Sequence, residues 1–186
     1  TCALPICGGT ISSNAYREIY ILAHLFSIPI TTTLMGKGAF PERNGLCVGM
    51  LGMHGTAYAN FSVSECDLLI ATGARFDDRV TGKLDLFANC AKILHLDIDP
   101  AEINKNKIAD LFILGDLKKT LKEILVTHKW NWEEIEVHTK RNEWLSNIYK
   151  WRKSYPLIVP RQQNKLLPQQ VINGIGKIYK KAIYTT

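Results

Sequence analysis

Five short apolar runs, joined by stretches with helical spacing or glycine turns, constrain the fold of this chain more than any other feature. They cover residues 3–7, 29–33, 67–71, 92–98 and 110–114. Several are apolar at successive positions, which is typical of strands buried on both faces of a parallel sheet. Helical spacing between the runs, and again at 117–126, favours helices that cross over the sheet. The sequence therefore predicts an α/β fold with a parallel, six-stranded or nearly six-stranded Rossmann-like sheet flanked by helices.

The segments between these runs give further local expectations. Residues 12–14 (Ser, Ser, Asn) offer side chains that can cap the amino end of a helix reaching Phe26. Residues 35–51 are rich in glycine and show little periodicity, whereas a helix is expected after His54. Pro100 suits the first turn of a short helix, and Pro168 begins another. Residues 183–186 have the composition of a further strand.

Composition excludes several classes of protein. Hydrophobic residues make up 46% and charged residues 22%, which is ordinary for a soluble globular domain. No apolar run approaches the roughly 20 residues that cross a bilayer, so no membrane association is expected. The first residues lack the pattern of a secretory signal. The five cysteines form no C-x-x-C pair and no zinc spacing, and we expect reduced thiols in a reducing compartment.

The formal net charge of +6 is unevenly distributed. Residues 1–116 hold 9 Lys and Arg against 12 Asp and Glu, whereas residues 117–186 hold 14 against 5. A basic half can indicate a nucleic-acid partner. Here the lysines are scattered, without interleaved aromatic residues that could stack on bases, so a solvated basic surface is favoured. Four tryptophans between 130 and 151 predict a helix with an aromatic face that lies against something larger.

Three glycine-bearing turns follow predicted strands, at Gly8 and Gly9, at residues 33–38, and at Gly73. In a parallel sheet this edge binds ligands, and glycine lets main-chain amides approach a phosphate. The three turns together predict a nucleotide-type ligand. However, Pro41 closely follows the G-x-G of Gly36 and Gly38, so the dinucleotide fingerprint is not met and a nicotinamide dehydrogenase is disfavoured.

Two loops and two acidic residues at a strand end complete the expected site. Residues 49–55 can wrap around a planar ligand, although His54 has no carboxylate placed to orient it for catalysis. Residues 75–79 hold two arginines and two aspartates, which can pair with one another or clamp a pyrophosphate. Asp97 and Asp99 end a strand, where an acid can accept from a ribose hydroxyl or cap the next helix. We expect Gly52, Arg75 and Asp97 to lie along one rim of the sheet.

Four long motifs carry a resemblance to a known family. They are IPITTTLMGKGAFPE, VGMLGMHGTAYAN, DLLIATGARFDDRVTGKLDLFA and KILHLDIDPAEINKNK. In order and spacing they closely resemble the central domain of acetolactate (acetohydroxyacid) synthase large subunits, from about Gly8 to Thr186. The resemblance implies enzymes of isoleucine, valine and leucine synthesis that depend on thiamine diphosphate and magnesium. They decarboxylate pyruvate and join the two-carbon unit to pyruvate or 2-oxobutyrate, while the middle domain holds FAD without net redox chemistry.

The resemblance also implies roles for individual residues. The expected FAD contacts are Gly8, Gly9, Thr33, Leu34, Met35, Leu51, Gly52, Met53, His54, Gly73, Ala74, Arg75, Asp77, Arg79, Asp97, Ile98, Gly115 and Asp116. Met53, Asp78 and Arg79 are expected to border the substrate channel as well. The family's thiamine-activating glutamate and magnesium-binding motif match no residues here, so this chain is expected to hold no catalytic residue and no metal ligand, and to be inactive alone.

The resemblance implies a domain organisation and partners. Residues 1–127 are expected to form the central FAD-binding domain, 128–167 a helical segment and interdomain linker, and 168–186 the start of a C-terminal thiamine-diphosphate-binding domain. A homodimer or homotetramer is expected, with a regulatory small subunit as a further candidate partner and with no nucleic acid and no membrane. The location is expected to be the plastid stroma or the bacterial cytoplasm.

Two departures and two alternatives accompany this interpretation. Cys7 stands where the family has the first of three glycines, and Lys37 replaces a residue that is usually small or apolar.

One alternative is another thiamine enzyme, of the pyruvate oxidase or glyoxylate carboligase type; a pyruvate oxidase would reduce its flavin when substrate is added. The other is a non-catalytic nucleotide-binding module with a basic tail, which would bind random DNA in a salt-dependent way.

Overall fold

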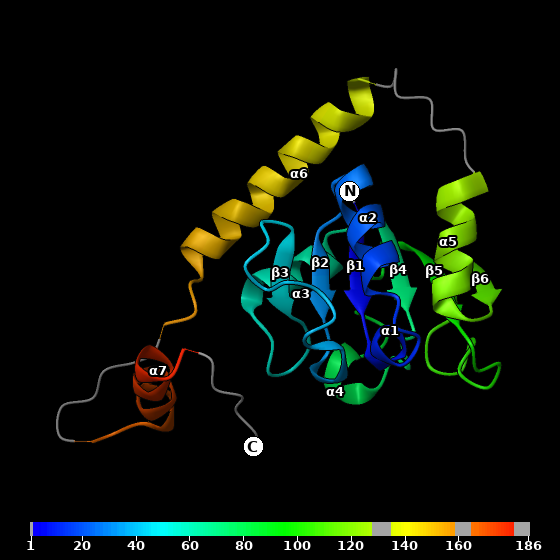
Figure 1. Cartoon of the computed structure of the whole chain (residues 1–186). Coiled ribbons are helices and arrows are strands. Elements are labelled where there is room, and N and C mark those ends of the chain that lie inside the picture. The colour runs from blue at the N-terminus through cyan, green and yellow to red at the C-terminus, as the bar shows by residue number, and fades with distance from the viewer. Residues whose placement is uncertain (1, 128–134, 159–164, 181–186) are drawn as a thin grey trace. The chain divides into compact units, whose positions relative to one another are not determined.

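The computed structural model describes residues 2–127, 135–158 and 165–180 (Figure 1). The chain divides into two compact units, Thr1–Tyr155 and Pro156–Thr186. Among the described residues, none of the helices combines the length and the apolar character that a bilayer crossing needs.

A parallel sheet of six strands forms the centre of the first unit, in the order β3-β2-β1-β4-β5-β6 (Figure 1). The strands are β1 (Cys2–Ile6), β2 (Ile30–Thr32), β3 (Cys47–Met50), β4 (Leu68–Thr72), β5 (Lys92–Asp97) and β6 (Leu111–Leu114). The chain proceeds outward from β1 to β3 and then returns to β4 on the other side of β1. This reversal places the carboxyl ends of β1 and β4 next to each other, where open α/β sheets bind ligands. The predicted fold class is confirmed.

Eight helical segments occur within the described residues. They are α1 (Gly8–Ser12), α2 (Tyr16–Phe26), the 3-10 turn η1 (Leu34–Gly36), α3 (Ala57–Ser64), α4 (Asp78–Thr81), α5 (Leu117–Thr127), α6 (Ile135–Ser154) and α7 (Pro168–Ile178).

Apolar residues are buried on both faces of the sheet, which explains the nearly continuous apolar runs. On one face Leu69 packs with residues of α3 and α6, and on the other face Ile70 packs with residues of α2 and α5. The two neighbouring residues of β4 point to opposite faces, as the twofold alternation of a strand requires.

Several local expectations were wrong. Residues 12–14 do not cap α2: Ser12 belongs to α1, Asn14 has a φ of 55°, and the residue before α2 is Ala15, which has no side-chain cap. The glycine-rich stretch contains β3, which pairs with β2. Turns replace the short helix expected after Pro100, with Asn104 at a φ of 59°. The strand expected at 183–186 lies outside the described residues.

The tryptophan-bearing helix packs against the first unit. Trp144 of α6 is 5% exposed, and its indole nitrogen donates to the carbonyl oxygen of Cys2 at 3.0 Å. Trp151 contacts Trp144 edge to face, with ring centroids 5.6 Å apart. The compact unit extends to Tyr155. The expected domain bounds at residues 127 and 167 stay predictions. Trp130 and Trp132 lie outside the described residues.

The second unit contains α7, which begins at Pro168 as the sequence predicts. The side-chain oxygen of Gln170 accepts from the main-chain nitrogen of Leu167 at 3.0 Å, which satisfies one donor at the amino end of the helix. Val171, Ile172, Ile175 and Ile178 are all exposed in this unit.

Candidate functional site

The glycine turns after β1 and β4 contact each other through their main chains. A methyl group added at Gly9 would lie 2.7 Å from the Cα of Gly73, and one added at Gly73 would lie 2.5 Å from the Cα of Gly9. Gly73 also has a φ of +61°, which glycine adopts without strain. The main-chain nitrogen of Gly73 donates to the carbonyl oxygen of Leu96 at 2.7 Å. Only glycine fits both turns, and side chains are excluded where the sheet order reverses.

A pocket of about 130 Å³ opens at this contact. Its walls come from α1 and its carboxyl end, the turn after β4, the end of β5 and the start of α5: Gly9, Ser12, Ser13, Gly73, Leu96, Asp97, Ile98, Asp116 and Leu117. Five of the residues expected to bind FAD are thus brought together, namely Gly9, Gly73, Asp97, Ile98 and Asp116. The sequence analysis assigned Ser12 and Ser13 to helix capping and missed them as pocket residues. Two carboxylates and two hydroxyls suit a ligand that carries hydroxyl groups.

The two pocket carboxylates are held by main-chain donors. Asp97 Oδ1 accepts from the nitrogen of Asp99 at 3.0 Å, and the carbonyl oxygen of Asp97 accepts from Gly115 at 2.9 Å. Asp116 Oδ1 accepts from the nitrogen of Lys119 at 2.9 Å and caps α5. Asp99 Oδ1 accepts from Ala101 at 2.9 Å, so Asp99 stabilises the turn that replaces the expected helix.

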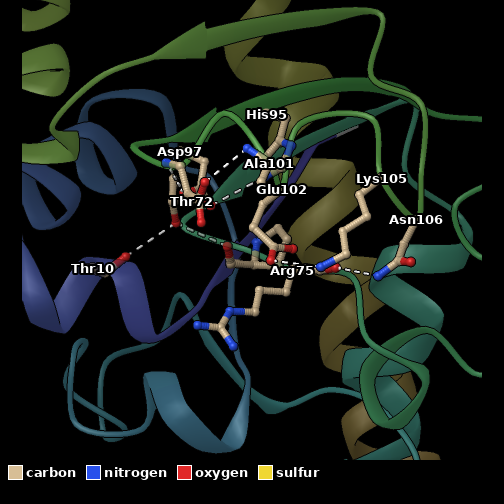
Figure 2. A network of polar contacts seen from close by, with 11 residues as sticks. Thr10, Thr72, Arg75, His95, Asp97, Ala101, Glu102, Lys105 and Asn106 are labelled. Carbon is tan, nitrogen blue, oxygen red and sulfur yellow. Dashed lines mark hydrogen bonds and ion pairs between the residues drawn. The ribbon is translucent and has the colours of Figure 1, made fainter.

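A buried histidine lies next to Asp97. Figure 2 shows His95 Nε2 directed toward the Asp97 carboxylate, with 3.7 Å between Nε2 and Oδ2. His95 is 0% exposed, and its ring packs edge to face against Phe76 with centroids 5.1 Å apart. Burial lowers the pKa of His95 below its ordinary value, although the negative charges of Asp97 and Glu102 act in the opposite direction. We therefore expect a neutral imidazole at neutral pH.

The loop after β3 contacts helix α4, which contains Arg79. The main-chain nitrogen of Met53 donates to the carbonyl oxygen of Arg79 at 3.0 Å. Gly52 has a φ of +93°, and a methyl group there would lie 2.4 Å from the same carbonyl oxygen. Asn60 fixes Gly52 from the other side, accepting from its nitrogen at 2.8 Å and donating to its oxygen at 3.1 Å. Leu51 is buried, whereas Met53 and His54 are exposed.

Both aspartates of the expected arginine clamp have local partners. Asp77 caps α4 by accepting from the nitrogen of Val80 at 3.2 Å. Asp78 and Arg79 form an exposed ion pair of 3.8 Å. The Arg75 side chain is exposed and extends away from His95 and Asp97 (Figure 2), while its carbonyl oxygen accepts from Asn106 at 2.9 Å.

The turn after β2 leaves two apolar side chains in solvent. Leu34 and Met35 are 71% and 73% exposed, while Thr33 before them is buried. A methyl group added at Gly8 would lie 3.4 Å from the Cβ of Met35, so this turn contacts the turn after β1. The positive charge of Lys37 is paired with Glu42, with 2.6 Å between nitrogen and oxygen.

The expected site residues therefore share one rim of the sheet but do not all line one pocket. Gly52 follows β3, Arg75 follows β4, and Asp97 ends β5, so all three are at the carboxyl edge. Of these three, only Asp97 lines the pocket. Among the described residues, no group of three His, Cys, Asp or Glu side chains could hold a metal ion. The binding roles themselves stay predictions.

Comparisons with known proteins agree with this geometry. Acetolactate synthase large subunits from Cyanidium caldarium and Porphyra purpurea are 56% and 50% identical over 98% of this chain. A probable acetolactate synthase large subunit from Methanocaldococcus jannaschii is 45% identical over 96% of it. The chain spans 31% of the length of each of these curated relatives. Residues 3–124 match the family model described as the central domain of thiamine pyrophosphate enzymes, and the chain belongs to that family.

Proposed function

We propose that this chain is the central part of an acetolactate synthase large subunit. The similarity to three such subunits over nearly the whole chain supports the proposal. The complete subunit would condense two pyruvates, or pyruvate and 2-oxobutyrate, with loss of CO₂ in branched-chain amino-acid synthesis. Thiamine diphosphate, held with Mg²⁺ by other parts of that subunit, would supply the nucleophilic carbon for decarboxylation. The names of these relatives favour this activity over pyruvate oxidase and glyoxylate carboligase.

Within the complete subunit, these residues would bind FAD along the carboxyl edge of the sheet. The observation that carries this proposal is the Gly9–Gly73 contact beside a pocket with two carboxylates. The absence of side chains at the contact lets a long dinucleotide approach the main chain closely. Asp97 and Asp116 would accept hydrogen bonds from sugar hydroxyls, because ionised carboxylates are strong acceptors.

The remaining expected residues would bind other parts of FAD. Arg75, exposed and extended, would contact the pyrophosphate through charge-assisted hydrogen bonds. The exposed side chains of Leu34, Met35 and Met53 would cover the flat ring system, which is an apolar surface. Met53, Asp78 and Arg79 would also border the path of the substrate. FAD would have no net redox role.

The partners and location follow from the same proposal. The subunit would form a homodimer or homotetramer, and a regulatory small subunit is a further partner that the family resemblance implies. Relatives come from red algal plastid genomes and from bacteria. The plastid stroma or the bacterial cytoplasm is therefore the proposed location.

Replacing Arg75 tests the FAD proposal directly. In the complete subunit, Arg75→Ala should weaken FAD binding by about 1.5–3 kcal/mol, because a charge-assisted hydrogen bond is lost. Equilibrium dialysis with FAD measures the change. The matched control is Arg43→Ala, which removes another exposed arginine at the amino side of β3 and should leave the affinity as it is. Unchanged FAD affinity in Arg75→Ala would reject the role of Arg75.

A further inference from the structure

His95 and Asp97 are two residues apart on β5, so their side chains point to the same face of the sheet. Asp97 reaches the pocket, whereas His95 is 0% exposed and lies behind it. The distance between His95 Nε2 and Asp97 Oδ2 is 3.7 Å, which is too long for a hydrogen bond and short enough for a strong charge interaction. The other oxygen, Oδ1, is already held by the nitrogen of Asp99. Oδ2 is therefore the oxygen whose position His95 can influence.

Besides Asp97, the main chain of Ala74 is a polar group that acts on the His95 ring. Both ring nitrogens are buried without a hydrogen-bond partner among the described residues. Ala71 of β4 and Phe112 of β6 are its neighbours across the sheet, and Phe76 packs against the ring. The charged groups that act on it are Asp97 and Glu102. A buried polar ring with unpaired nitrogens is costly for the fold, and this cost calls for a compensating role.

We propose that His95 is a positioning residue for the Asp97 carboxylate and makes nucleotide binding at the pocket depend on pH. This inference rests on the proposed FAD site. A neutral His95 leaves the negative charge of Asp97 available to the hydroxyl groups of the ligand. A protonated His95 attracts Oδ2 toward the core and shares its charge, so the carboxylate becomes a weaker acceptor at the pocket.

The direction of the pH effect follows from the surroundings of the histidine. Burial lowers the pKa of His95. Its imidazole therefore becomes protonated at a lower pH than the imidazole of an exposed histidine. Glu102 contributes to the attraction of the proton; its Oε1 is 3.0 Å from Lys105, while its Oε2 is buried without a partner among the described residues. FAD affinity should therefore be constant near neutral pH and fall in the acidic range.

The test measures FAD affinity of the complete subunit from about pH 8 to about pH 5, the range in which histidines titrate. The background protein is the complete subunit without substitutions. Four proteins are compared: this background, His95→Gln, Asp97→Asn and the combination of the last two. His24→Gln in the same background is the matched control, because His24 is exposed and belongs to α2.

We expect the background protein to lose about tenfold in affinity as His95 becomes charged, and His95→Gln to show no such loss. Asp97→Asn should bind FAD about tenfold more weakly at every pH, and adding His95→Gln to it should change little further. His24→Gln should keep the background profile.

The outcomes separate this inference from the proposed function. If Asp97→Asn weakens binding but the His95→Gln profile matches the background, the positioning role is overturned and the FAD site stands. If Asp97→Asn leaves FAD affinity unchanged, the assignment of Asp97 in the proposed function fails first. Should His95→Gln not fold, the background and Asp97→Asn profiles decide: an acid-dependent loss in the background alone supports the role, and equal profiles reject it.

Discussion

The two halves of the carboxyl edge are built in different ways. In the pocket half, which comprises the turns after β1, β4, β5 and β6, the main chains of Gly9 and Gly73 touch and Asp97 is nearly buried. In the loop half, which comprises the turns after β2 and β3 together with α4, Met35 and Met53 are 73% and 66% exposed. Both halves contain glycines that no other residue can replace without strain.

The difference indicates that the two halves perform different tasks. The pocket half is fixed by contacts between strands, so it presents acceptors in positions set before a ligand arrives. The loop half keeps a large apolar surface in solvent, which is unfavourable until a ligand or another part of a protein covers it. We expect substitutions in the pocket half to affect the whole fold, and those in the loop half to act locally.

The largest expected effect is that of Gly9→Ala in the pocket half. Its methyl group would lie 2.7 Å from the Cα of Gly73, and strands β1 and β4 prevent either turn from moving away. We expect the free energy of unfolding to fall by about 2–4 kcal/mol. In Gly45→Ala, the control, the methyl group meets nothing within 4 Å, and the change should stay within about 0.5 kcal/mol. Urea unfolding measures both, and equal effects would contradict the assigned rigidity of this half.

A smaller effect is expected for Gly52→Ala in the loop half. The residue has a φ of +93°, and its methyl group would lie 2.4 Å from the carbonyl oxygen of Arg79. Because that oxygen belongs to the four-residue helix α4 and not to the central sheet, we expect a loss of about 2 kcal/mol. Gly38→Ala is the control: it has a φ of +89° but no atom within 4 Å, so it isolates the strain of the backbone. If Gly52→Ala lowered the free energy of unfolding more than Gly9→Ala, the greater rigidity assigned to the pocket half would be contradicted.

Removing the helix caps of the two halves should lower the free energy of unfolding by less than the glycine substitutions do. Asp116 in the pocket half caps the 11-residue helix α5, and Asp116→Ala should lower the free energy of unfolding by about 1 kcal/mol. Asp77 in the loop half caps only the four residues of α4, so Asp77→Ala should cost less. Thermal unfolding of both variants gives the ranking. If Asp77→Ala were the more harmful, α4 would stabilise the fold more than its length indicates.

The smallest expected effect is the pH dependence that His95 adds to stability. Because burial lowers the pKa of His95, the unfolded chain binds a proton at a higher pH than the folded chain. Stability should therefore decline as the pH falls below about 6.5, the ordinary value for histidine, until the folded chain is also protonated. His95→Gln should remove this part of the slope in urea unfolding at several pH values. An unchanged slope would show that other groups cause it.

The sequence predicted the elements that are buried on both faces. The apolar runs at 67–71 and 92–98 became β4 and β5, because strands in the middle of a parallel sheet need apolar residues on both sides. It missed β3, a short edge strand inside a glycine-rich stretch, since Gly49 has a φ of +92° and breaks any periodicity. It also missed α1, whose first residues are two glycines, which are poor helix formers.

The candidate site was predictable where it depends on topology. Turns that follow parallel strands must meet at one edge, so Gly9, Gly73 and Asp97 could be grouped from the sequence. The part that depends on local geometry could not be read in advance. Ser12 and Ser13 line the pocket because α1 ends there, and Asp77 caps the short helix α4. His95 and Asp97 share a face of the sheet because they are two residues apart on β5, but the 3.7 Å between Nε2 and Oδ2 depends on side-chain conformations that the sequence does not show.

The outermost strand β6 has a consequence for how the segment behaves in solution. In the part of the chain that the structure describes, β6 pairs only with β5, and its four residues carry no charge. Leu111, Phe112 and Leu114 are exposed along it. Unpaired main-chain groups beside apolar side chains form a template onto which a strand of a second molecule can add. Wherever this edge is left uncovered, we expect self-association that grows with protein concentration.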